Sequence, residues 1–258
     1  AGAGVQADLK AMSALGVFAT TAITALTAQN TVEVRGVQPT PAEFVVAQVE
    51  TVLDDFEVRA VKTGMLATAA TVAAVADLAH AGRLPNLVVD PVMVASSGAR
   101  LLEPDAERLY VEQLLPRARV ITPNLYEAGV LVGRRLRTLA DQRHAAEELA
   151  ALGPEVVVVK GGHATEDAGS DAVDVVAVRR AAGASEVTER RAARIDTRHN
   201  HGSGCSFASA IAAGLARGRD PLEAVDAAKT FVHRAIAGGA GWHLGSGVGP
   251  LDPFGWER

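Results

Sequence analysis

The strongest chemical signal in the sequence is a glycine-rich segment, His201-Gly202-Ser203-Gly204-Cys205, which directly precedes an alanine-rich run. Glycines on both sides of a serine let successive backbone N–H groups turn toward one point at a helix start, where they bind anions together with the helix dipole. Cys205 is expected in the first turn of that helix, where the pKa of a thiol falls below about 8.5. The alternative is a simple turn in which Cys205 packs against Ala208 and Ala212. No Lys-Ser or Lys-Thr pair follows the glycines, so the segment is not a P-loop.

Asn124 and Glu127 place an amide and a carboxylate three positions apart at the predicted start of a helix, where both side chains can face the same way. In one interpretation they orient the water ligands of Mg²⁺ and the phosphates of a nucleotide, because Mg²⁺ prefers a few oxygen ligands and keeps several waters. In the other they form a capping box, in which Asn124 caps the helix and Glu127 reaches back to it. The spacing alone favours the cap.

Three further polar side chains, Gln29, Asp90 and Lys160, stand near the ends of runs that predict strands. Sheets built from parallel strands bind their ligands beyond the carboxyl ends of the strands. Lys160 is either solvated there or directed at a ligand phosphate, and the adjacent Gly161-Gly162 favours the phosphate. Asp90 is either a turn residue or a carboxylate that faces a metal ion. Gln29 suits the hydrogen-bonding edge of a heterocycle, although an exposed loop glutamine has the same pattern.

Helical and strand-like segments alternate along the chain. Apolar spacing, with proline in a first turn and glycine after a last one, predicts helices at 5–15, 41–56, 69–81, 105–115, 125–132, 141–152, 204–216 and 222–237. Short β-branched runs predict strands at 20–26, 58–62, 87–90, 119–122, 155–160, 172–178 and 187–194, the last two as an antiparallel pair. The alternation predicts one α/β domain with a mainly parallel central sheet and helices on both faces.

The composition is that of a soluble globular protein and excludes several other classes. The 258 residues include 25 basic and 30 acidic side chains, and the net charge of −5 argues against a nucleic-acid partner. Every apolar run is interrupted, which argues against a membrane span, and no charged-then-apolar segment predicts a secretory leader. Cys205 is the only cysteine, so no intrachain disulfide forms and a reducing, cytoplasmic location is expected. Because Ala1-Gly2-Ala3-Gly4 is typical of the middle of a turn, we also expect that an initial segment precedes it.

Seven short segments, spread over nearly the whole chain to its glycine-rich end at 245–250, resemble one known family in their residues and their order. They are GAGVQADLK (2–10), TAQNT (27–31), KTGML (62–66), VDPVMV (89–94), TPNLYE (122–127), KGGH (160–163) and HGSGC (201–205). Each segment is weak alone, but seven in register are specific. The set is similar to the hydroxymethylpyrimidine/phosphomethylpyrimidine kinases of thiamine biosynthesis, in the ribokinase-like superfamily.

The resemblance implies a ribokinase-like three-layer sandwich, with one kinase domain over residues 1–258 that uses ATP and Mg²⁺ and forms a homodimer. It also implies a strand and a Ser-Asp-rich turn before Ala1. Such an enzyme phosphorylates 4-amino-5-hydroxymethyl-2-methylpyrimidine and then converts the monophosphate into the pyrophosphate. The residues that the resemblance assigns to the pyrimidine are Gln29, Met65, Val92 and Gly4. Those that it assigns to ATP, phosphates and Mg²⁺ are Lys160, Asn124 and Glu127, with Asp90 and Glu127 as the metal ligands. The anion hole consists of Gly202, Ser203 and Gly204, beside Cys205, which stands where many sugar kinases of the superfamily carry an aspartate base.

Several positions depart from the family pattern. Ser96 stands where lysine is common and Ala99 where aspartate is frequent, in a stretch that resembles the mobile flap over the phosphates. Before the anion hole, His199 and Asn200 occupy positions where the family often reads Asn-Thr. Ser203 replaces a common threonine and keeps the hydroxyl group.

Two other functions compete with the pyrimidine kinase. A pyridoxal kinase is the nearer one, because related enzymes share the cysteine version of the loop and some accept both vitamins. The other is a pyrimidine-binding sensor that keeps the pocket and has lost catalysis. The presence of Lys160, Asn124, Glu127 and Cys205 argues against the sensor.

Overall fold

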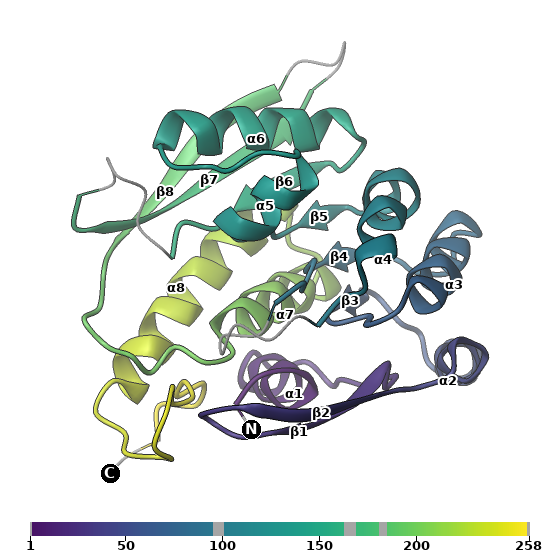
Figure 1. Cartoon of the computed structure of the whole chain (residues 1–258), viewed down its shortest axis with the longest axis horizontal. Coiled ribbons are helices and arrows are strands. Elements are labelled where there is room, and N and C mark those ends of the chain that lie inside the picture. The colour runs from purple at the N-terminus through teal and green to yellow at the C-terminus, as the bar shows by residue number, and fades with distance from the viewer. Residues whose placement is uncertain (1, 95–100, 163–168, 181–184, 257–258) are drawn as a thin grey trace.

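The computed structural model describes residues 2–94, 101–162, 169–180 and 185–256. Its centre is a six-stranded sheet in the order β3-β4-β5-β6-β7-β8 (Figure 1). The strands are β3 (Lys62–Thr63), β4 (Val88–Val89), β5 (Val120–Ile121), β6 (Val156–Val159), β7 (Asp171–Arg179) and β8 (Ser185–Ala193). Strands β3 to β6 run parallel, and β7 and β8 extend the sheet in antiparallel fashion. The predicted parallel sheet and its antiparallel pair are both confirmed.

Helices cover both faces of this sheet (Figure 1). The first face carries α2 (Ala42–Asp55), α3 (Ala69–His80), α4 (Pro104–Leu109), α5 (Leu125–Leu131) and α6 (Leu139–Ala151), and the second carries α1 (Val5–Ala14), α7 (Ser203–Ala216) and α8 (Pro221–Gly239). Successive strand residues point to opposite faces. Val89 and Ile121 therefore pack into the first core, while Val88 and Val120 pack into the second. The predicted arrangement of three layers is confirmed.

Three of the parallel strands, β4, β5 and β6, form at short, uninterrupted runs of valine and isoleucine. All four residues of β6 are buried, because a parallel strand that is covered on both faces has no side open to solvent. The edge strand β8 instead carries charged side chains such as Arg190 and Arg191. Charged edges of this kind discourage pairing with the sheet of another molecule.

The strand predicted at 20–26 is wrong in its position. The structure places β1 at Ala25–Gln29, where it pairs with β2 (Val34–Pro39) as an antiparallel hairpin that forms a separate two-stranded sheet. Most residues of the hairpin are exposed. The β-branched run at 20–24 predicts a strand locally, but a strand also needs a partner, and β2 pairs with the residues that follow this run.

Two other predicted elements are shorter or less regular than expected. The strand predicted at 58–62 is reduced to β3, because only Lys62–Thr63 pair with β4. The helix predicted at 105–115 starts as α4 and then continues as a π-helix over Tyr110–Leu114 and a 3₁₀ turn over Leu115–Arg117. Pro116 has no N–H to donate, which prevents a regular end to the helix. In the part of the chain that the structure describes, no helix has both the length and the apolar surface to cross a membrane.

The placement of the core makes a testable prediction about stability. Ile121 on β5 is fully buried, whereas Leu26 on the hairpin is 63% exposed. We expect Ile121→Ala to lower the free energy of unfolding by about 2–5 kcal/mol, through lost burial and a new cavity. Leu26→Ala is expected to change it by less than about 0.5 kcal/mol. Urea unfolding of both variants checks the prediction, and equal losses would contradict the assigned layers.

Candidate active site

A cavity of about 1580 Å³ includes the end of the sheet where the parallel strands finish, and it also extends along residues 16–27 and 56–61. The segments after β3, β4, β5 and β6 contribute to its wall, together with α1, the hairpin and the start of α7. Every site residue predicted from the sequence lines this cavity: Gly4, Gln29, Met65, Asp90, Val92, Asn124, Glu127, Lys160, Gly202, Ser203, Gly204 and Cys205. The predicted Ser96, Ala99 and His163 lie outside the described residues.

Lys160 and Asp90 form an ion pair between the ends of β6 and β4. Nζ of Lys160 donates to Oδ1 of Asp90 over 2.9 Å, and the two side chains are only 15% and 3% exposed. The hydroxyl of Thr122, just after β5, donates to the same oxygen. Burial alone would lower the pKa of Lys160, but the negative charges of Asp90 and Glu127 outweigh burial and raise that pKa. Lys160 is therefore held as a cation.

Asn124 and Glu127 form the capping box that their spacing predicts. The N–H of Glu127 donates to Oδ1 of Asn124 over 2.9 Å, and the N–H of Asn124 donates to Oε2 of Glu127 over 2.8 Å. Burial raises the pKa of Glu127 to about 7, although the positive charge of Lys160 acts in the opposite direction. The Glu127 carboxyl group therefore caps α5 and also interacts electrostatically with the ion pair of Lys160.

Helix α7 begins at the segment predicted to bind an anion. Gly202 is its N-cap, with a φ of 88° in the left-handed region that glycine adopts without strain. A Cβ at Gly202 would overlap the carbonyl oxygen of Gly2, so the close packing of these two turns also requires glycine. The N–H of Ser203 donates to the carbonyl of Asn200. That bond uses the backbone donor that Ser203 was expected to offer to a ligand.

The free donors at the start of α7 belong to Gly204 and Cys205. Neither N–H donates to a backbone carbonyl anywhere in the described ranges, as is usual for the first turn of a helix. A Cβ on Gly204 would lie 3.2 Å from Nζ of Lys160. A fixed ammonium and two helix-start amides therefore lie close together in one cavity, which is an arrangement that binds phosphate.

Cys205 lies in the first turn of α7, as predicted, but its pKa moves in the opposite direction to the prediction. Burial raises the pKa of the thiol to about 11, and the positive charge of Lys62 offsets only part of this rise. The backbone of Gly4 acts on this pKa in the same direction as Lys62. The predicted low pKa is wrong because loss of water destabilises the thiolate more than the helix start and Lys62 stabilise it.

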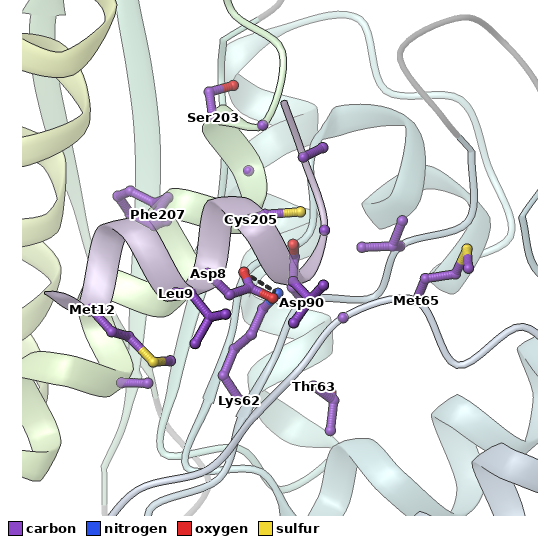
Figure 2. Close-up of a pocket in the computed structure, with 18 of the residues that line it drawn as sticks. Asp8, Leu9, Met12, Lys62, Thr63, Met65, Asp90, Ser203, Cys205 and Phe207 are labelled. Carbon is purple, nitrogen blue, oxygen red and sulfur yellow. Dashed lines mark hydrogen bonds and ion pairs between the residues drawn. The ribbon is translucent and has the colours of Figure 1, made fainter. Parts of the chain in front are cut away.

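A second buried ion pair, which the sequence analysis missed, lies near Cys205 (Figure 2). Nζ of Lys62 donates to Oδ1 of Asp8 over 2.9 Å, and 3% of the lysine side chain is exposed. The hydroxyl of Ser209 donates to the same oxygen over 2.7 Å. Burial acts to lower the pKa of Lys62, but the negative charges of Asp8, Cys205 and Asp90, together with the hydrogen bond to Asp8, outweigh it and raise that pKa. The sequence showed only a lysine at the end of a predicted strand. Its partner stands 54 positions away, so no local pattern indicated the pair.

The residues assigned to the pyrimidine come from the hairpin and from two strand ends. Gln29 reaches the cavity from the end of β1, while Met65 and Val92 follow β3 and β4. The hydroxyl of Thr24 donates to the carbonyl of Met65 over 2.5 Å, which ties the segment before the hairpin to the segment after β3. The Gln29 amide on the hairpin and the Lys160 ammonium after β6 therefore line the same cavity.

Comparisons with known proteins match almost the whole length of the chain. The sequence model of the phosphomethylpyrimidine kinase family matches residues 1–252. The hydroxymethylpyrimidine/phosphomethylpyrimidine kinase of Rhizobium meliloti (strain 1021) is 46% identical over 255 residues, which cover 98% of this chain and 92% of that relative.

Solved structures are similar over almost the same length. The pyridoxal kinase from Staphylococcus aureus in complex with AMP-PCP and pyridoxal has a TM-score of 0.87 and 35% identity, covering 100% of this chain and 90% of that one. The phosphomethylpyrimidine kinase from Clostridium difficile 630 has a TM-score of 0.75 and 36% identity, covering 91% of this chain and 94% of that one. The expected ribokinase-like sandwich is confirmed, and the match along residues 1–252 shows that this chain belongs to the phosphomethylpyrimidine kinase family.

Proposed function

We propose that this chain transfers the γ-phosphoryl group of ATP to the hydroxyl of 4-amino-5-hydroxymethyl-2-methylpyrimidine and then phosphorylates the resulting monophosphate. One observation carries the proposal: Nζ of Lys160 lies beside the start of α7, 3.2 Å from the position of a Cβ on Gly204. Phosphoryl transfer passes through a loose transition state, in which positioning and neutralisation of charge dominate. The fixed ammonium and the unbonded amides supply that neutralisation.

The choice of substrates rests on the cavity wall and on the relatives. Gln29 offers both a donor and an acceptor to the edge of an aminopyrimidine, with Met65 and Val92 as apolar surface for the ring. The relative from Rhizobium meliloti is named for both pyrimidine kinase activities, and the Staphylococcus aureus structure contains AMP-PCP, an analogue of ATP. Both names support a nucleotide-dependent kinase whose acceptor is a small heterocyclic alcohol.

Asp90 and Glu127 suit a Mg²⁺ ion that is shared with the nucleotide. Mg²⁺ usually takes one or two carboxylates and completes its shell with water and phosphate oxygens. No group of three His, Cys, Asp or Glu side chains able to hold a metal occurs in the described ranges, so the remaining ligands would come from the phosphates. Oδ1 of Asp90 accepts from Lys160 and Thr122, which leaves Oδ2 for the ion. When bound, Mg²⁺ supplies positive charge to the phosphates.

Cys205 is assigned a secondary role as acceptor of the hydroxymethyl proton. Only the thiolate can accept a proton, and a thiol with a pKa of about 11 is mostly protonated at neutral pH. The neighbouring Lys62 stabilises the small thiolate fraction. A strong base is not essential in a loose transition state, so the larger contribution comes from Lys160 and the amides.

A pyridoxal kinase is the second candidate, and one observation favours it. The Staphylococcus aureus pyridoxal kinase superposes with a TM-score of 0.87, compared with 0.75 for the Clostridium difficile phosphomethylpyrimidine kinase. Both substrates are heterocyclic alcohols of similar size. The family match and the names of the curated relatives favour the pyrimidine.

Identification of the products by mass spectrometry tests the proposed function. Incubation with Mg-ATP and the pyrimidine alcohol is expected to add first one phosphate and then a second one. A product with one phosphate would leave only the first step. Parallel assays with pyridoxal separate the two candidates, and faster turnover of pyridoxal would overturn the choice of substrate. Binding of the pyrimidine without release of ADP would identify a sensor instead.

Replacement of Lys160 tests the central ammonium. Lys160→Met keeps the unbranched shape of the side chain, one atom shorter, and removes the charge. We therefore expect kcat to fall by about 10²–10³-fold, the usual cost of losing one donor to a transition state. Steady-state kinetics measure the effect, and thermal unfolding confirms that the variant is folded. Lys10→Met is the matched control, because Lys10 is exposed on α1. An unchanged kcat in Lys160→Met would contradict the assigned role.

Replacement of Cys205 tests the secondary proton acceptor. Cys205→Ala is expected to lower kcat by about 10- to 100-fold, which is no more than the smallest usual contribution of a general base. Its effect on ATP affinity is expected to be smaller than its effect on kcat. The comparison of kcat with the dissociation constant for AMP-PCP separates the two effects. If kcat stays at the wild-type value, the thiol takes no part in the reaction.

A further inference from the structure

The turn that follows β6 is fixed from both of its neighbouring strands. On one side the N–H of Lys160 donates to the carbonyl of Pro123 over 2.8 Å, next to a parallel bridge between Lys160 and Asn124. On the other side the N–H of Gly161 donates to Oδ1 of Asp174, on β7, over 2.9 Å. The backbone that carries the Lys160 side chain therefore has a fixed point on each side.

Gly161 and Gly162 stand in different surroundings. A Cβ on Gly161 would overlap the carbonyl oxygen of Val173, whereas a Cβ on Gly162 would meet no atom within 4 Å. Glycine at position 161 permits the close approach between the turn and β7. That approach brings the Gly161 N–H within reach of the Asp174 carboxylate.

Helix α8 holds the Asp174 carboxylate in place. Nζ of Lys229 donates to Oδ2 of Asp174 over 2.8 Å and to the carbonyl of Ala172 over 3.0 Å. The lysine and aspartate side chains are 16% and 8% exposed. Both carboxylate oxygens are therefore engaged, one by Gly161 and the other by Lys229, so the orientation of the carboxylate is determined on both sides.

We propose that Asp174 is a positioning residue for phosphoryl transfer, which sets the place of the Lys160 ammonium through the N–H of Gly161. Lys229 acts one step further away, because it holds Asp174. The proposal rests on the proposed function, in which Lys160 neutralises the transferred phosphate. A displacement of about 1 Å in a catalytic group can lower a rate on the order of 100-fold, so a bond to the turn beside Lys160 has a direct effect on catalysis.

Two double variants separate the hydrogen bond to Gly161 from the buried ion pair. Asp174→Asn with Lys229→Met removes both charges and keeps an oxygen that accepts from the Gly161 N–H. Asp174→Leu with Lys229→Met removes the same charges together with the acceptor, and the side chain keeps nearly the same shape. Both variants lose the ion pair, so a difference between them reports the hydrogen bond.

Steady-state kinetics with Mg-ATP and the pyrimidine alcohol are expected to separate the two variants. The kcat of the leucine variant is expected to fall on the order of 100-fold below that of the asparagine variant, with the KM for the pyrimidine unchanged. Hydrogen exchange of the Gly161 amide, followed by NMR, is expected to be slow in the wild type and the asparagine variant and fast in the leucine variant. A merely structural role would lower the melting temperature of both variants without separating their kcat values. Equal kcat values, or equal exchange at Gly161, would overturn the proposal.

A replacement variant and a separate assay of the wild type cover the cases in which folding or activity fails. If the leucine variant does not fold, Asp174→Ser with Lys229→Met takes its place, because the shorter side chain does not reach Gly161, and the same comparison applies. The wild-type protein tests the proposed function separately, since a lack of phosphorylated product would defeat that function alone. Amide exchange at Gly161 needs no turnover, and equal exchange in the two variants would still overturn the positioning role.

Discussion

The proposed function depends on one buried ammonium, that of Lys160, which must stay charged and hold its position. A lysine removed from water tends to lose its proton unless a carboxylate lies close to it, and Lys160 has Asp90 at 2.9 Å. This contact joins residues 70 positions apart. It exists because β4 and β6 lie on either side of β5 and run parallel to it, so their final residues meet at one edge of the sheet. Strand order, register and the two layers of helices therefore all contribute to one ion pair.

Among the described residues, the site contains a fixed positive charge on Lys160 but no unusually reactive nucleophile or base. The Cys205 thiol stays protonated because burial raises its pKa to about 11, even at a helix start and with Lys62 nearby. Glu127 has a pKa raised to about 7, also through burial, while it caps α5. For these two groups loss of water outweighs the nearby positive charges and hydrogen-bond donors, whereas for Lys160 and Lys62 the surrounding negative charges outweigh loss of water. A loose transition state suits such a site, since it requires neutralisation of charge more than a strong base.

Local patterns predicted the parts of the molecule that local physics determines. The valine run of β6, the capping box of Asn124 and Glu127, and the glycine-rich start of α7 were all visible in the sequence. The place of β1 was not, because pairing with β2 selects the residues that follow the β-branched run. Contacts between distant residues, such as the pair of Asp8 and Lys62, left almost no local trace. The direction of the Cys205 pKa shift was also missed, because it depends on burial.

The hairpin of β1 and β2 is a sheet of its own, mostly exposed, and it brings Gln29 to the cavity. The groups proposed to bind phosphate, Lys160 and the amides at the start of α7, are instead built on the central sheet and on α7. A kinase built in this way can change the small molecule that it accepts through substitutions in the exposed hairpin, while the residues proposed to bind phosphate stay unchanged. Enzymes that act on different vitamin precursors can thus diverge from a single scaffold without rebuilding its interior.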